Sequence, residues 1–147
     1  MAGAGDVNGD GYADLLIGAP ENGDGGAAYL VLGSASPSGG SLSSAIKYSA
    51  EAAGDQAGTG VAGAGDVNGD GYDDLLVGAP GNDTFTGAAY LMLGSASLSC
   101  TTHLGDCAAV KYTGEAEYDQ AGHSVAGVGD VDGDGYTDLL VGAPFND

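Results

Sequence analysis

Acidic and amide side chains recur at a fixed spacing in a fifteen-residue segment that the chain repeats three times. The copies span residues 6–20, 66–80 and 130–144. In the first copy, oxygen-bearing side chains stand at positions 1, 3, 5 and 9 of the segment, as Asp6, Asn8, Asp10 and Asp14. Glycines between them let the backbone turn tightly, so that the carbonyl of Tyr12 at position 7 can point to the same centre. A set of hard oxygen ligands with no softer atom is what Ca²⁺ prefers. The segment therefore predicts a calcium-binding loop.

The predicted loop differs from an EF-hand at its closing position. An EF-hand places a bidentate glutamate at position 12 of the loop. The three copies have Ile17, Val77 and Val141 there instead. We therefore expect the aspartate at position 9 to close each loop. The Leu-Leu-Ile or Leu-Leu-Val run that follows stops at Gly-Ala-Pro, which is too short for a helix and predicts a strand.

Asp-Gly and Asn-Gly pairs also form ordinary hairpin turns, which is the alternative to a metal site. A single copy would not separate the two interpretations. The three copies, however, keep an oxygen-bearing side chain at every ligand position, while a neighbouring position changes from Ala13 to Asp73 to Thr137. This pattern favours three calcium sites over three plain turns.

The charge of the chain excludes several kinds of partner. The formal net charge is -19, and Lys47 and Lys111 are the only lysine or arginine residues. We therefore expect no nucleic-acid partner and no insertion into a membrane. Eleven of the 21 acidic residues lie in or beside the three loops, so three bound Ca²⁺ ions would neutralise six charges. The residues after Met1 do not resemble a secretion signal, and we expect any targeting segment to have been removed or to lie outside this sequence.

The two cysteines, Cys100 and Cys107, enclose six residues that are rich in turn formers. This spacing suits a local disulfide worth about 2 to 3 kcal/mol and does not match a zinc motif. Two free thiols of a cytosolic protein are the alternative. A disulfide together with calcium loops predicts an extracellular or secreted protein, or one at the cell surface.

The segments between the loops also repeat, and each full unit predicts four short strands. In the second unit they lie at 61–67, 74–79, 88–93 and 109–113. The first strand is almost entirely Gly, Ala and Val, as expected where backbones crowd together. The second is apolar throughout after Asp74 and should be buried on both faces. The fourth carries the lysines, which commonly protect an exposed sheet edge.

The repeat predicts an all-β fold built from blades of a β-propeller type, each with four antiparallel strands. The loops follow one another at intervals of 60 and 64 residues. We expect a first blade at residues 1–52, a second at 53–116 and the first half of a third at 117–147. This is an incomplete propeller, because a closed ring needs at least four blades.

The second and third loops belong to a longer pattern, Asp-Gln-Ala-Gly-x-x-Val-Ala-x-x-Gly-Asp-x-Asn/Asp-Gly-Asp-Gly-x-x-Asp-Leu-Leu-Val-Gly-Ala-Pro. This pattern resembles the FG-GAP repeat, the blade of the integrin α-subunit propeller and of many secreted bacterial proteins. The resemblance covers essentially the whole chain and implies Ca²⁺ in the hairpin between the first two strands of a blade. The Phe-Gly pair of the family is replaced by Ala57-Gly58 and Ala121-Gly122, which leaves open how tightly successive blades pack. The implied ligands, with the tyrosines contributing carbonyl oxygens, are Asp6, Asn8, Asp10, Tyr12 and Asp14; Asp66, Asn68, Asp70, Tyr72 and Asp74; and Asp130, Asp132, Asp134, Tyr136 and Asp138.

Two explanations of the incomplete third blade remain open. The chain is either a segment of a longer propeller, or its open blade docks head-to-tail on the next copy. A head-to-tail contact that does not close builds a filament, and an unpaired strand edge is a template for such growth.

We favour a non-catalytic extracellular calcium-binding protein that acts as a self-assembling structural subunit, because the repeats are nearly identical and the loops short. The alternative is an adhesion module that binds a protein or a glycan, or a propeller fragment attached to an enzyme. Catalysis by this chain is not expected. Asp119, His123 and Ser124 are the residue types of a catalytic triad, but Ser124 directly follows His123 on an expected strand and points to the opposite face.

Overall fold

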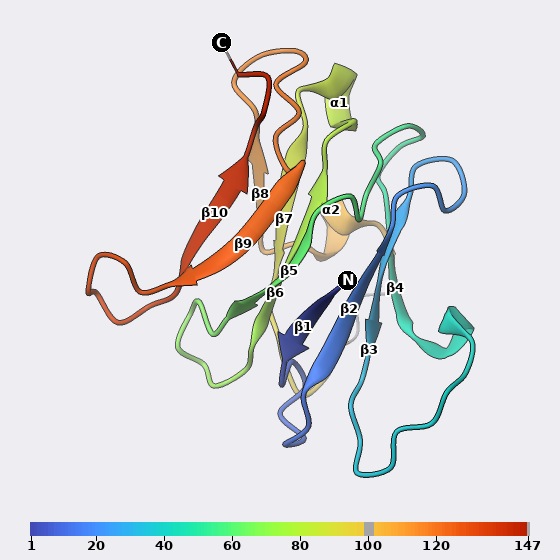
Figure 1. Ribbon diagram of the computed structural model, residues 1–147, viewed down its shortest axis with the longest axis vertical. Coiled ribbons are helices and arrows are strands. Elements are labelled where there is room, and N and C mark those ends of the chain that lie inside the picture. The colour runs from blue at the N-terminus through green and yellow to red at the C-terminus, as the bar shows by residue number, and fades with distance from the viewer. Residues whose placement is uncertain (99–101, 147) are drawn as a thin grey trace.

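The computed structural model describes residues 1–98 and 102–146 and shows an all-β chain (Figure 1). Two antiparallel four-stranded sheets and one two-stranded sheet follow one another, and the strand order in each four-stranded sheet is the chain order. The first sheet consists of β1 (Ala2–Gly5), β2 (Asp14–Ala19), β3 (Ala27–Val31) and β4 (Ile46–Ser49). The second consists of β5 (Val61–Gly65), β6 (Asp74–Ala79), β7 (Ala88–Met92) and β8 (Val110–Thr113). The third consists of β9 (Ser124–Gly129) and β10 (Asp138–Gly142). The predicted fold class is confirmed, with two complete blades and half of a third.

Within residues 1–98 and 102–146, three short helical turns lie in the connections between strands. They are η1 (Leu42–Ser44), α1 (Asn82–Phe85) and α2 (Leu104–Cys107). In the described part of the chain, no helix has the length and apolar character needed to cross a membrane. The predicted disulfide involves Cys100, which lies outside the described residues, so this pairing stays a prediction.

The inner strands of successive sheets crowd together as the sequence predicts. β1 packs beside β5, and β5 packs beside β9. A Cβ atom at Gly63 would lie 2.7 Å from the carbonyl oxygen of Gly3, and one at Gly127 would lie 2.8 Å from that of Ala64. Only glycine fits at these two positions, because the obstacle is backbone and cannot turn away.

Burial of the second strand depends on its place in the row of sheets. All six residues of β6 are buried, which confirms the prediction for this strand. β2 and β10 are buried only in part. The physical reason is that β6 lies between two neighbouring sheets, whereas β2 and β10 each have a packed sheet on one side only.

The Ala57-Gly58 pair, which replaces Phe-Gly, lies at a close contact between the first two sheets. Ala57 is fully buried and forms a parallel bridge with Gly26. Within the second sheet, the Gly58 amide donates to the carbonyl of Gly78 on β6 at 2.9 Å, which holds the pair in place. A Cβ atom at Gly18 would collide with the Gly58 carbonyl. The sheets therefore pack through close backbone approach, without an aromatic side chain.

The largest apolar core lies between the first two sheets. Side chains from β2, β3 and β4 meet side chains from β6, β7 and α2 there. Its larger members are Leu16, Leu30, Tyr48, Val77, Tyr90, Met92 and Leu104. A smaller core joins the second sheet to the third and includes Leu76, Leu91, Val125 and Leu139.

Candidate calcium-binding loops

The three acidic segments form the hairpins β1–β2, β5–β6 and β9–β10, and all three hairpins project from the same side of the molecule (Figure 1). A shift of strand register between Gly3 and Gly5 leads the chain into the first loop. Gly9 and Gly11 then adopt φ angles of 73° and 88°. Glycine reaches this left-handed region without steric penalty, which is why the loop alternates glycine with its polar residues.

The aspartate at position 1 is the centre of each loop. In the second loop, Asp66 Oδ1 accepts from the amides of Gly69 at 2.7 Å and Asp70 at 3.1 Å, and Oδ2 accepts from Gly71 at 2.8 Å. These hydrogen bonds, the one from Gly71 above all, hold the pKa of the Asp66 carboxyl below its usual value. The ionised form, which a calcium ligand requires, is thus favoured before any metal binds.

Positions 3 and 5 continue the same hydrogen-bonded turn. Asn68 Oδ1 accepts from the Asp70 amide at 3.0 Å, and Asp70 Oδ1 accepts from the Tyr72 amide at 3.0 Å. The Asn68 side-chain amide also donates to Asp70 Oδ2 at 2.9 Å. The first loop repeats these three contacts. The structure therefore brings the side chains at positions 1, 3 and 5 together.

The third loop has a carboxylate at position 3, where the other loops have an amide. One carboxylate oxygen each of Asp130, Asp132 and Asp138 lies within 4.8 Å of the other two. Like charges at this distance repel, so a divalent cation between them would relieve the repulsion. This loop gathers the densest negative charge among the three candidate sites.

The aspartate at position 9 has a second role that the sequence analysis missed. Asp74 is fully buried, and its two oxygens accept from the amides of Val67 and Gly94, both at 2.8 Å. Burial raises the pKa of this carboxyl. Asp14 makes the equivalent contacts to Val7 and Gly33. The residue thus ties the loop to the end of the third strand, a role that the recurrent Leu-Gly after that strand could have indicated.

Adjacent loops are also linked to each other, through a residue that the sequence analysis treated only as a neighbouring acid. Asp73 Oδ2 accepts from the Asp6 amide at 2.7 Å, and the Asp73 amide donates to the Asp6 carbonyl at 3.2 Å. The Tyr72 ring lies over Gly9 of the preceding loop, where a Cβ atom would come within 2.6 Å of it. The first two candidate sites are therefore parts of one continuous surface.

Asp119, one of the three residues of the triad type, has a structural role in the fold. Asp119 Oδ2 accepts from the amides of Glu115 at 2.9 Å and Ala116 at 2.8 Å and from Asn146 Nδ2 at 3.0 Å. Asp119 is 4% exposed, and its hydrogen bonds close a turn. This is a structural use of the carboxylate.

A row of antiparallel four-stranded blades with acidic hairpins on one side defines a repeat protein of the β-propeller type. Comparison with known families gives the particular repeat. The FG-GAP repeat model matches residues 2–31, 57–92 and 121–147, more than half of the chain. The chain belongs to the FG-GAP repeat family. The resemblance inferred from the loops is thereby confirmed.

Integrin α subunits are among the similar proteins. The chain is 33% identical to integrin alpha-PS5 of Drosophila melanogaster over 144 residues, which are 95% of this chain and 14% of that protein. It is 29% identical to integrin alpha-4 of Xenopus laevis over 151 residues, 98% of this chain and 14% of that protein. It is 34% identical to integrin alpha-PS2 of Drosophila melanogaster over 154 residues, 97% of this chain and 10% of that protein. The chain therefore spans a small fraction of the length of these relatives.

Proposed function

We propose that the chain is a non-catalytic, calcium-stabilised propeller segment that serves an adhesion or ligand-binding protein outside the cell or at its surface. The observation that carries this proposal is the FG-GAP match in all three units together with the similarity to integrin α subunits over nearly the whole chain. The ligand is a protein or a glycan held by the loops that join the strands. We assign residues 1–52, 53–116 and 117–147 to successive blades.

This proposal reverses the order of the two functions considered from the sequence. From the sequence alone, a self-assembling filament subunit is favoured and the adhesion module is the alternative. FG-GAP repeats and integrin-like similarity support the adhesion module instead. In the described part of the chain β10 pairs only with β9, and this observation does not favour either function.

The proposed role of calcium is to hold each hairpin in shape. In the third loop the carboxylates at positions 1, 3 and 9 converge, so this loop without a cation carries uncompensated repulsion. Binding of Ca²⁺ to the folded loop then adds directly to the free energy of unfolding. The third site should bind most tightly because Asp132 adds a negative ligand. Titration calorimetry of an Asp132→Asn variant should show weaker binding at one site, and unchanged affinity would contradict this ranking.

The adhesion proposal is tested by measuring binding of the fluorescently labelled chain to an array of glycans and purified extracellular-matrix proteins. We expect saturable binding in millimolar Ca²⁺ and loss of that binding in EDTA. A Lys47→Met variant controls for charge-driven binding, because Lys47 is one of two cations on a strongly acidic chain. Binding that persists in EDTA would contradict the calcium role, and an empty array would contradict the adhesion role.

A further inference from the structure

The first candidate loop is anchored to the second sheet by hydrogen bonds of its own backbone. The Asp6 amide donates to Asp73 Oδ2 at 2.7 Å, and the Asp6 carbonyl accepts from the Asp73 amide at 3.2 Å. The next residue, Val7, is fully buried, and its carbonyl accepts from the amide of Ser95, which follows β7, at 2.9 Å. Positions 1 and 2 of the first loop are therefore fixed by residues that belong to the second sheet and its loop.

Asp73 bonds to the residue around which the first loop is organised. The Asp6 carboxylate accepts from the amides of Asp10 at 3.0 Å and Gly11 at 2.8 Å, as Asp66 does in the second loop. The two peptide groups on either side of the Asp6 Cα atom are both bonded to Asp73. This arrangement fixes the direction of the Asp6 side chain. Asp73 thus controls how the position-1 carboxylate enters the first loop.

The contact between the second and third loops lacks this carboxylate. Thr137 holds the position of Asp73, and its hydroxyl oxygen lies 3.1 Å from the place that a Cβ atom of Gly65 would take. Among the described residues, no hydrogen bond joins Thr137 to Asp66, the position-1 aspartate of the second loop. The two neighbouring pairs of loops therefore differ in one specific contact, which makes the second pair a control for the first.

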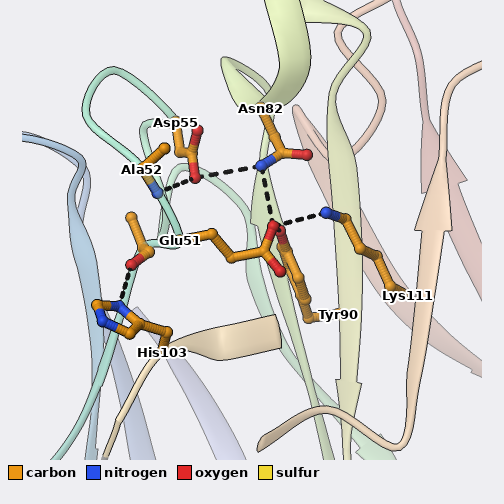
Figure 2. A network of polar contacts seen from close by, with 8 residues as sticks. Glu51, Ala52, Asp55, Asn82, Tyr90, His103 and Lys111 are labelled. Carbon is orange, nitrogen blue, oxygen red and sulfur yellow. Dashed lines mark hydrogen bonds and ion pairs between the residues drawn. The ribbon is translucent and has the colours of Figure 1, made fainter. Parts of the chain in front are cut away.

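A second polar contact between the first two sheets lies at the opposite end of β6. Figure 2 shows Glu51, which follows β4 and whose Oε2 accepts from Lys111 Nζ at 2.6 Å and Asn82 Nδ2 at 3.2 Å. Asn82 lies just after β6 ends, whereas Asp73 lies just before β6 begins. Both contacts hold the same two sheets together, but only the one made by Asp73 reaches a candidate calcium loop. The Glu51 contact can therefore be broken without touching a loop.

We propose that Asp73 is a positioning residue for Ca²⁺ at the first loop, supplied by the neighbouring repeat. Its hydrogen bond holds Asp6 in the orientation that the loop requires, so that less ordering remains to be done when the metal binds. The first site is then built from two repeats, although all its expected ligands lie in one. The inference rests on the proposed function, because it concerns a loop that is proposed to bind Ca²⁺.

Two substitutions separate positioning from simple attraction between charges. Asp73→Asn removes the charge and keeps an oxygen that can accept the Asp6 amide, whereas Asp73→Ala removes both. Alanine suits this position of the segment, because the first loop carries Ala13 there. Two-dimensional NMR with a competing chelator measures the Kd of Ca²⁺ at each site separately. Gly9 and Gly11 report on the first site, and the corresponding glycines of the second loop show in the same sample that the variant is folded.

In Asp73→Ala we expect the Kd of the first site to rise about 5- to 20-fold and that of the second site to change by less than about 2-fold. Asp73→Asn should raise the Kd of the first site by less than about 3-fold, because the acceptor oxygen remains. Thr137→Ala should leave the Kd of the second site within about 2-fold of the parent value. Lys111→Met should lower Tm by loosening the Glu51 contact and should leave both Kd values within about 2-fold.

A measurement without metal follows the same positioning. In EDTA, hydrogen exchange of the Asp10 and Gly11 amides, which donate to Asp6, should be faster in Asp73→Ala than in the parent. Lys111→Met should leave these two amides unchanged. The comparison separates the specific effect of Asp73 from a general loosening of the two sheets.

The possible failures are distinguishable. A parent chain whose loop signals do not respond to Ca²⁺ would overturn the proposed calcium role, and this inference with it. A parent that binds Ca²⁺, while Asp73→Ala keeps the same Kd at the first site, would overturn this inference alone. Equal losses in Asp73→Ala and Asp73→Asn would also overturn it, since charge and not the hydrogen bond would then be responsible. Selective weakening of the first site with faster exchange of its amides is the supporting result.

Discussion

Replacing Asp74 by Asn in the absence of calcium separates the structural role of this carboxylate from its proposed role as a metal ligand. Both oxygens of the fully buried side chain accept backbone amides, from Val67 and Gly94 at 2.8 Å each. Asparagine offers only one oxygen, so one amide must face an NH₂ group. Loss of one charge-assisted hydrogen bond and burial of an unsatisfied donor should together reduce the free energy of unfolding by about 2 to 4 kcal/mol.

An opposing effect is smaller. The substitution removes one negative charge from a loop that also contains Asp66 and Asp70, whose charges add to burial in raising the pKa of Asp74. Removing the charge therefore relieves some repulsion. Asp70 is exposed, so water and salt screen this repulsion much more than they weaken the two buried hydrogen bonds. The net effect should remain clearly destabilising.

The assay is equilibrium unfolding in urea with EDTA present, and Asp138→Asn is the matched control. Asp138 holds the same loop position, but among the described residues its carboxylate accepts one backbone amide, from Val131 at 2.8 Å, and it is only half-buried. The control should lose about 1 kcal/mol or less. Equal losses for the two variants, or a more stable Asp74→Asn protein, would refute the reasoning, because repulsion would then outweigh the buried hydrogen bonds.

Three further predictions concern pH, calcium and backbone packing. Burial raises the pKa of Tyr48 to about 12, so the folded state keeps the phenol proton to a higher pH than the unfolded state does. The free energy of unfolding should therefore be unaffected by this group below about pH 10. Between pH 10 and 12 it should fall by up to about 1.4 kcal/mol per pH unit. Burial and the nearby Glu51 carboxylate also raise the pKa of Tyr90, so Tyr48→Phe should reduce this slope in pH-dependent urea unfolding without abolishing it, and Tyr112→Phe, at the exposed equivalent position, should leave the slope unchanged. Chelation of Ca²⁺ by EDTA should lower Tm markedly in scanning calorimetry, and an unchanged Tm would contradict the calcium role. Light scattering in Ca²⁺ and in EDTA should report whether any self-association depends on the metal. Gly78→Ala should lower the free energy of unfolding in urea by about 3 kcal/mol or more, because a Cβ atom would collide with the Gly122 carbonyl. Gly142→Ala should have a smaller effect, because the obstacle there is the Ser124 hydroxyl, which can rotate away. Equal effects of the two substitutions would contradict the packing argument.

The sequence predicted the fold because each repeat contains its own signals for strands and turns. The predicted strand at 74–79 coincides with β6, and the one at 88–93 differs from β7 by one residue at its end. The packing between sheets was harder to foresee. The buried pair Ala57-Gly58 fits because backbones approach closely there, and that approach arises between residues far apart in sequence.

The candidate site was predictable only where its contacts are local. Oxygen side chains at alternate positions reveal a turn in which Asp66 accepts amides three to five residues further along. The hydrogen bond between the Asp6 amide and Asp73 joins residues 67 positions apart, and no local pattern announces it. Whether these oxygens bind Ca²⁺ stays a prediction for the metal titration.

Equivalent residues of this chain have nearly the same local sequence but very different surroundings. Tyr48 is buried and Tyr112 is exposed, and Lys111 has a carboxylate partner that Lys47 lacks among the described residues. Local propensity cannot explain such differences, because it is almost the same in each pair. They follow from whether a neighbouring sheet covers the residue, so stability in this array resides largely in the contacts between units. The same contacts provide matched controls within a single molecule, since each substitution at a covered position has an uncovered counterpart.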